Sequence, residues 1–89
     1  MLAITGAAVA SIRGLVTDLP GGAGLRVALE KPGNGTEPEF SLDVVRGPEE
    51  DDEVVEQEGA RVFVAAAASA YFEDKVLDAD GGTFTFAPA

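Results

Sequence analysis

The sequence predicts an α+β domain made mainly of strands, with short antiparallel or mixed sheets packed against an N-terminal helix and one further short helix. Two observations predict this class. Apolar residues at helical spacing occur near the N-terminus, and a single alanine run follows in the second half of the chain. Elsewhere apolar and polar residues alternate in short segments separated by turn residues, as in half-buried strands. The order of helix, strands, helix and strands implies few parallel crossovers, so we expect mostly antiparallel pairing.

The first predicted element is an amphipathic helix over residues 5–19. Thr5 stands where an N-cap is expected, because its hydroxyl can accept a hydrogen bond from the first turn. Pro20-Gly21-Gly22 ends the helix, since proline cannot continue the hydrogen-bond ladder and glycine readily adopts a left-handed conformation. The apolar residues that share one helical face are Ala8, Val9, Ile12, Leu15, Val16 and Leu19.

A β-hairpin follows the helix. Alternation over residues 24–30 places Leu25, Val27 and Leu29 on one side of a half-buried strand, and residues 40–45 repeat the pattern. The connecting segment contains Asn34-Gly35, a strong turn signal because both residues tolerate positive φ. We therefore expect two antiparallel strands joined near Asn34.

Three further predictions complete the fold. Val54-Val55 begins a strand that turns at Glu58-Gly59 into residues 61–64, which are apolar and β-branched enough for a central strand. Residues 65–70 form a short helix, with Tyr71 and Phe72 packing at the rim and in the core. Residues 76–78 and 83–86 form the last two strands, joined by a tight turn at residues 80–82. With no repeat or linker, residues 1–89 are expected to form one domain.

Composition excludes several kinds of chemistry. The 89 residues contain no cysteine, histidine or tryptophan, so thiolate nucleophiles, disulfides and imidazole catalysis are absent from them. Sixteen acidic residues face six basic ones, a net charge of -10 that repels nucleic acid and anionic membranes. Another protein with a basic surface is the better partner. The start of the chain lacks the features of a signal peptide, and no apolar stretch reaches membrane-spanning length, so we expect a cytoplasmic protein.

The candidate site residues are five consecutive acids: Glu49, Glu50, Asp51, Asp52 and Glu53. A solvated turn is the favoured interpretation, because five carboxylates cannot be buried together. Weak binding of a cation or a basic partner is the alternative, although calcium loops alternate their ligands with other residues. Acidic neighbours such as Glu73 and Asp74 point in different directions on a short helix, and nothing marks a cleft around them. We therefore predict no catalytic residues and no enzyme.

Five segments carry a resemblance to a known family in their order and spacing: Gly24–Val27, Gly47–Glu49, Val54–Glu56, Gly59–Val64 and Val76–Asp78. This arrangement resembles the HesB-like family, which contains the A-type carriers and scaffolds of iron-sulfur cluster assembly. The resemblance covers nearly the whole chain and implies a HesB-like fold.

The resemblance also implies a ligand set that these residues lack. Three cysteines hold the iron or cluster in the family, one in a loop that falls at about Asn34 and two in a C-terminal Cys-x-Cys, whereas this sequence reaches Ala89 without either. Oxygen and amide donors replace thiolates poorly. We therefore expect a non-catalytic protein-binding or structural module with no cofactor. The alternative is an accessory protein of iron-sulfur assembly that binds iron weakly through carboxylates, or with thiolates from a partner. Association with a second copy stays open.

Overall fold

The computed structural model describes residues 1–31 and 39–88. In chain order, the secondary structure elements of these residues are β1 (Ala3–Ile4), α1 (Gly6–Leu15), β2 (Gly24–Lys31), β3 (Glu39–Val45), β4 (Glu53–Gln57), β5 (Ala60–Val64), α2 (Ala66–Phe72), β6 (Lys75–Asp80) and β7 (Thr83–Pro88).

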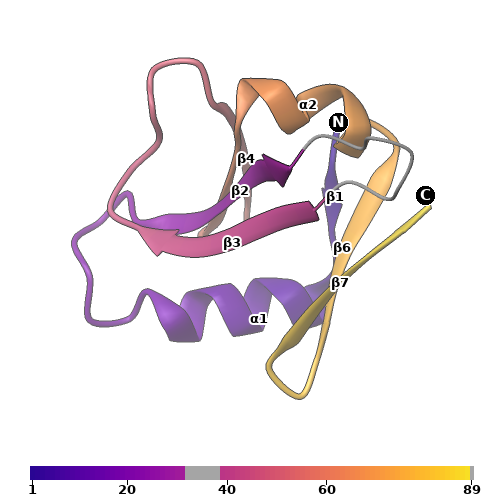
Figure 1. The fold of residues 1–89 in the computed structure, drawn as a ribbon. Coiled ribbons are helices and arrows are strands. Elements are labelled where there is room, and N and C mark those ends of the chain that lie inside the picture. The colour runs from indigo at the N-terminus through magenta and orange to yellow at the C-terminus, as the bar shows by residue number, and fades with distance from the viewer. Residues whose placement is uncertain (32–38, 89) are drawn as a thin grey trace.

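The strands form two mixed sheets, with a three-stranded sheet standing at one end of a four-stranded one (Figure 1). The larger sheet has the order β3-β2-β5-β4, and the smaller has the order β1-β6-β7. Strand β2 pairs with β5 in parallel, as β1 does with β6, while the remaining pairs are antiparallel. The predicted α+β class is confirmed, and β5 is an interior strand as expected.

One hydrophobic core joins the two sheets and both helices. Helix α1 packs against β5 and β6, while α2 packs against β2 and β6. Each helix therefore bridges the two sheets. The buried residues of this core are Leu2, Ile4, Ala8, Val9, Ile12, Leu25, Val27, Val55, Ala60, Val62, Val64, Ala68, Phe72 and Leu77.

Helix α1 begins as predicted and ends earlier. The Thr5 hydroxyl accepts a hydrogen bond from the Ala8 N–H at 3.2 Å, which confirms the N-cap. The helix stops at Leu15 rather than at residue 19. The backbone leaves the helical conformation at the C-cap Val16, and although Leu15 is exposed, Val16 and Leu19 remain partly buried in the turn that follows.

Strand β1 was missed in the sequence. Leu2 and Ile4 are buried, and Ala3 and Ile4 pair in parallel with Val76 and Leu77. The Thr5 N–H continues this contact by donating to the Leu77 carbonyl at 3.0 Å. Two paired residues are too few to show an alternation of apolar and polar residues, so β1 is recognised only by its pairing with the distant strand β6.

The β2–β3 pairing is confirmed and Phe40 packs against the core, but the expected burial is wrong at Leu42 and Val44. Leu42 and Val44 lie opposite Val27 and Leu25, yet they remain 37% and 40% exposed. Strand β3 is the edge of its sheet, and α1 packs farther in, on β5, so no element covers this end of the apolar face within the described residues.

The predicted turns and the second helix agree with the structure. Glu58 and Gly59 have φ of 51° and 86°, the positive values of a type I′ turn between β4 and β5. Phe72 of α2 is buried, and its ring contacts those of Phe40 and Phe86. The predicted turn at Asn34 lies outside the described residues. Among those that are described, no helix is both long and apolar enough to cross a membrane.

Candidate functional site

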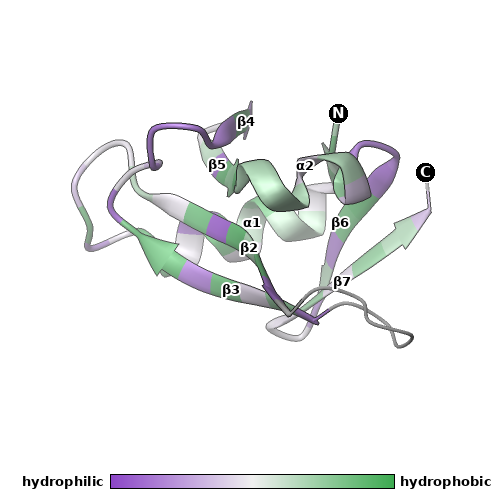
Figure 2. Ribbon diagram, turned by 45° about the horizontal axis from the view of Figure 1, so that its top comes forward, coloured by the Kyte–Doolittle hydropathy of each residue, from purple (hydrophilic) through white to green (hydrophobic). Residues whose placement is uncertain are grey.

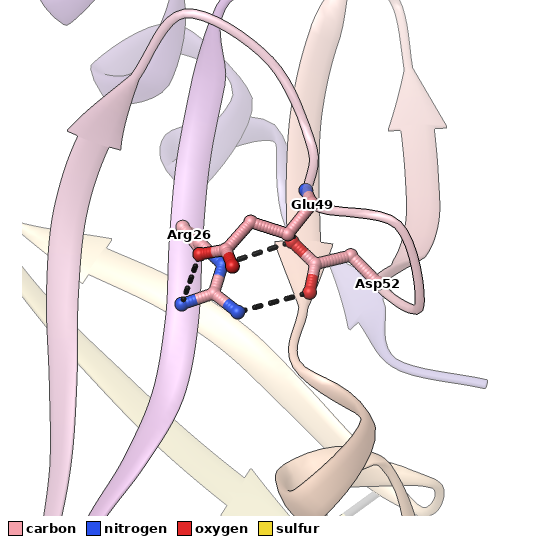
Figure 3. A network of polar contacts seen from close by, with 3 residues as sticks. All are labelled: Arg26, Glu49 and Asp52. Carbon is pink, nitrogen blue, oxygen red and sulfur yellow. Dashed lines mark hydrogen bonds and ion pairs between the residues drawn. The ribbon is translucent and has the colours of Figure 1, made fainter.

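An ionic network lies on the outer face of the four-stranded sheet, the face opposite Leu25 and Val27. Arg26 stands on this face because successive residues of β2 point to opposite sides. Phe63, which lies beside Arg26 on the neighbouring strand β5, points to the same face and is buried. This part of the outer face is therefore shielded from solvent. Residues 46–52 carry the chain from β3 at one edge to β4 at the other and bring the acidic run to Arg26 (Figure 3).

Arg26 binds two acids of the run at once (Figure 3). Its Nε donates to Asp52 Oδ2 at 2.9 Å and its Nη2 donates to Asp52 Oδ1 at 3.0 Å, a bidentate pair. The Arg26 Nη1 lies 3.3 Å from Glu49 Oε2. The Glu49 N–H donates to Asp52 Oδ2 at 2.9 Å, a hydrogen bond within the segment that connects β3 to β4. The network thus fixes the crossing segment to the sheet.

Burial and charge make this an ion pair rather than an acid-base pair. The Asp52 side chain is 2% exposed and that of Arg26 is 21% exposed. The hydrogen bonds from Arg26 hold the pKa of Asp52 below its ordinary value, and the same bonds raise the pKa of Arg26. Both groups keep their charge at neutral pH, so neither exchanges a proton with a substrate there.

The structure places the five predicted acids in different surroundings. Glu49 and Asp52 meet at Arg26, whereas Glu50 and Asp51 are exposed in the turn and Glu53 begins β4. The expected solvated turn is wrong at Asp52, because Arg26 compensates the burial of its charge. No group of three or more acidic side chains in residues 1–31 and 39–88 is arranged to hold a metal ion. Asn34 lies outside these residues.

An open hollow of about 440 Å³ adjoins the network. Its walls are Arg26, the acidic residues 49–52 and the alanines at positions 65–67. The small methyl groups leave the space. Beside it, Arg26, Glu49 and Asp52 are bonded to one another, while Glu50 and Asp51 are exposed. One wall of the hollow is therefore charged and the other apolar.

Sequence reasoning missed the role of Arg26. The available signal was its position, an arginine on the outward side of a central strand that is followed in the sequence by an acidic run. A guanidinium on a covered sheet face requires a carboxylate partner, because an unpaired buried charge is costly. The alternation of residues 24–30 was therefore enough to indicate that Arg26 needs a carboxylate partner, though not to identify which of the five acids it is.

The two-sheet fold and the five segments that resemble the HesB-like family define a class of protein concerned with iron-sulfur clusters. The family model described as iron-sulphur cluster biosynthesis matches residues 1–87. The chain belongs to this family, and the HesB-like resemblance is confirmed. The family is one of carriers and scaffolds rather than of enzymes. No curated protein sequence matches the chain.

Solved structures agree with this assignment. Escherichia coli SufA, involved in biosynthesis of iron-sulfur clusters, is 32% identical with a TM-score of 0.81, over 98% of this chain and 79% of that one. A protein from Aquifex aeolicus solved by NMR is 25% identical, with a TM-score of 0.73, and the match covers 99% and 91% of the two chains. IscA with its [2Fe-2S] cluster has a TM-score of 0.73 at 22% identity over 99% and 82%, a likeness of fold.

The segments that carry the resemblance maintain the fold. A Cβ on Gly24 would lie 2.5 Å from the Arg61 carbonyl oxygen, so only glycine permits the close approach of β2 and β5. Leu77 is buried in the core, and Asp78 accepts a 2.7 Å hydrogen bond from the Thr5 hydroxyl at the start of α1. The donors in these 89 residues do not suit a cluster, because iron-sulfur clusters are held by thiolates and the sequence contains no cysteine; two carboxylates of the acidic run are moreover engaged by Arg26.

Proposed function

We propose that this chain is a non-catalytic, protein-binding member of the iron-sulphur cluster biosynthesis family that does not itself hold a cluster. One observation carries the proposal. The acidic run is the densest set of alternative ligands in the chain, and Arg26 occupies Asp52 and Glu49 within it. A cation there would have to displace a bidentate guanidinium.

The partner in this proposal is a protein with a basic surface. The net charge of -10 disfavours contact with other acidic molecules, including nucleic acid, and raises the encounter rate with positively charged proteins. The edges of the sheets supply unpaired main-chain groups on which such contacts form.

Anaerobic reconstitution tests the first half of the proposal. The purified chain is incubated with ferrous iron and sulfide, desalted, and assayed for bound iron and visible absorption. We expect a colourless protein with no more iron than an unrelated acidic protein treated alongside. A brown protein that keeps its colour through desalting would favour the alternative, an accessory protein that binds iron through carboxylates.

Co-purification tests the second half. The tagged chain is recovered from its native host at low salt, and bound proteins are compared with those on an unrelated protein of equal net charge. We expect at least one protein specific to this chain, released when the salt concentration rises because electrostatic attraction is screened. Recovery of the same proteins on both baits would count against a protein-binding function.

A further inference from the structure

The free edge of the four-stranded sheet is formed by β4, which has β5 on one side and no strand on the other within the described residues. The type I′ turn makes Gln57 and Ala60 a hydrogen-bonded pair. Hydrogen-bonded and non-hydrogen-bonded pairs alternate along an antiparallel ladder. The main-chain N–H and C=O groups of Val54 and Glu56 are therefore directed away from β5, toward the free edge.

An exposed apolar side chain lies on the same strand. Val54 is 48% exposed, while Val55 next to it points into the core and is buried. Val54 lies opposite the buried Phe63 of β5, and the segment that leads into β4 is hydrophilic (Figure 2). A pairing strand would cover this valine as well as its main-chain groups.

The charge of this edge is negative. Glu53 and Glu56 belong to β4, Glu58 follows in the turn, and Glu50 and Asp51 precede it. Arg61 on β5 offsets one of these charges through its 2.8 Å ion pair with Glu56. Along β4, Glu53 directly precedes Val54, and Glu56 is itself the second main-chain position that is open to a partner.

This charge discriminates between occupants of the edge. A second copy paired through β4 would bring glutamates close to glutamates, and like charges across a strand pair are destabilising. A strand that carries lysine or arginine would instead gain an opposite charge at each of these positions.

We propose that β4 accepts an extended, basic segment of a partner protein as an additional strand, with lysine or arginine beside Glu53 and Glu56 and an apolar side chain beside Val54. Main-chain hydrogen bonds hold such a strand, and the side-chain pattern selects it. The inference rests on the proposed protein-binding function, and it adds the surface and the chemistry of the partner.

The probe is the peptide Lys-Thr-Lys-Val-Val-Lys-Lys, which in antiparallel pairing sets lysines against Glu53 and Glu56 and valines against Val54 and Val55. Amide hydrogen exchange of the labelled protein is measured by NMR with and without saturating peptide. We expect exchange at Val54 and Glu56 to slow by about tenfold or more, because their N–H groups gain carbonyl partners. Val55 and Gln57, already bonded toward β5, change less. Binding without protection at Val54 and Glu56 would overturn the proposal.

Two controls separate strand pairing from charge attraction. Glu56→Lys is expected to weaken peptide binding about tenfold, whereas Asp80→Lys, an equal change of net charge on an exposed residue of the other sheet, changes it less than twofold. Equal weakening by both would refute a defined site. A peptide of the same sequence that is N-methylated at its third and fifth residues, those opposite Glu56 and Val54, keeps its charge but cannot donate main-chain hydrogen bonds to β4. It should neither bind as tightly nor protect Val54, and equal protection by it would contradict strand addition.

The outcome for native partners distinguishes this inference from the proposed function. If a co-purified protein binds the Glu56→Lys chain as well as the unchanged chain, the β4 edge is wrong and the protein-binding function stands. If no specific protein is recovered while the peptide protects Val54 and Glu56, the edge is competent and the proposed function is wrong.

Discussion

Breaking the ion pair between Arg26 and Asp52 should destabilise the fold substantially. Arg26→Ala removes two charge-assisted hydrogen bonds and leaves a carboxylate that is 2% exposed, with the Glu49 N–H as its one remaining partner among the described residues. Breaking a fully buried pair costs about 3–5 kcal/mol. Because the Arg26 side chain is 21% exposed, solvent reaches this pair, and we expect about 3 kcal/mol for Arg26→Ala.

Urea unfolding, followed by circular dichroism, measures the effect. A domain of this size has an m-value of about 1 kcal/mol/M, so the midpoint should fall by about 3 M if m is unchanged. Asp52→Ala and the double variant complete a cycle, in which we expect a coupling of about 2 kcal/mol.

The matched control is Glu49→Gln, which alters the 3.3 Å contact to Arg26 of a side chain that is 70% exposed, so its cost should stay below about 0.5 kcal/mol. A coupling below about 0.5 kcal/mol, or a Glu49→Gln cost equal to that of Asp52→Ala, would refute the reasoning.

Three further predictions concern the same fold. Because the folded-state pKa of Asp52 lies below its ordinary 3.8, its contribution is fully present above that pH and is lost as pH falls through the lower folded value. The stability gap between the unchanged chain and Asp52→Asn should therefore shrink below about pH 4 in urea titrations, and a gap independent of pH would contradict this cause. Gly24→Ala should cost about 2–3 kcal/mol by the same assay, because its Cβ would meet the Arg61 carbonyl at 2.5 Å, whereas Gly14→Ala, with open space around its Cβ in α1, should stabilise by about 0.5–1 kcal/mol. Thr5→Val should cost about 1 kcal/mol, because the Ala8 N–H loses its acceptor and Asp78 loses a donor; thermal unfolding would show a lower midpoint.

Local patterns were enough for most of the elements. Alternation identified β2, β3 and β7 because the strand period is two, and apolar, β-branched residues between turn signals identified β5. Thr5 identified the start of α1 because a cap depends only on its own first turn.

The misses all depend on distant parts of the chain. Strand β1 exists only through β6, and the exposure of Leu42 depends on where α1 packs, which no local pattern encodes. The bond between Arg26 and Asp52 joins residues 26 positions apart and was not predicted, because the choice of acid depends on the path of the crossing segment.

The parallel contact of β1 with β6 constrains how the molecule is completed during synthesis. Ala3 and Ile4 acquire their strand partners only when residues 76 and 77 have been synthesised. The apolar Leu2 and Ile4, buried in the folded protein, therefore stay exposed until the segment of β6, more than 70 residues later in the sequence, has been made.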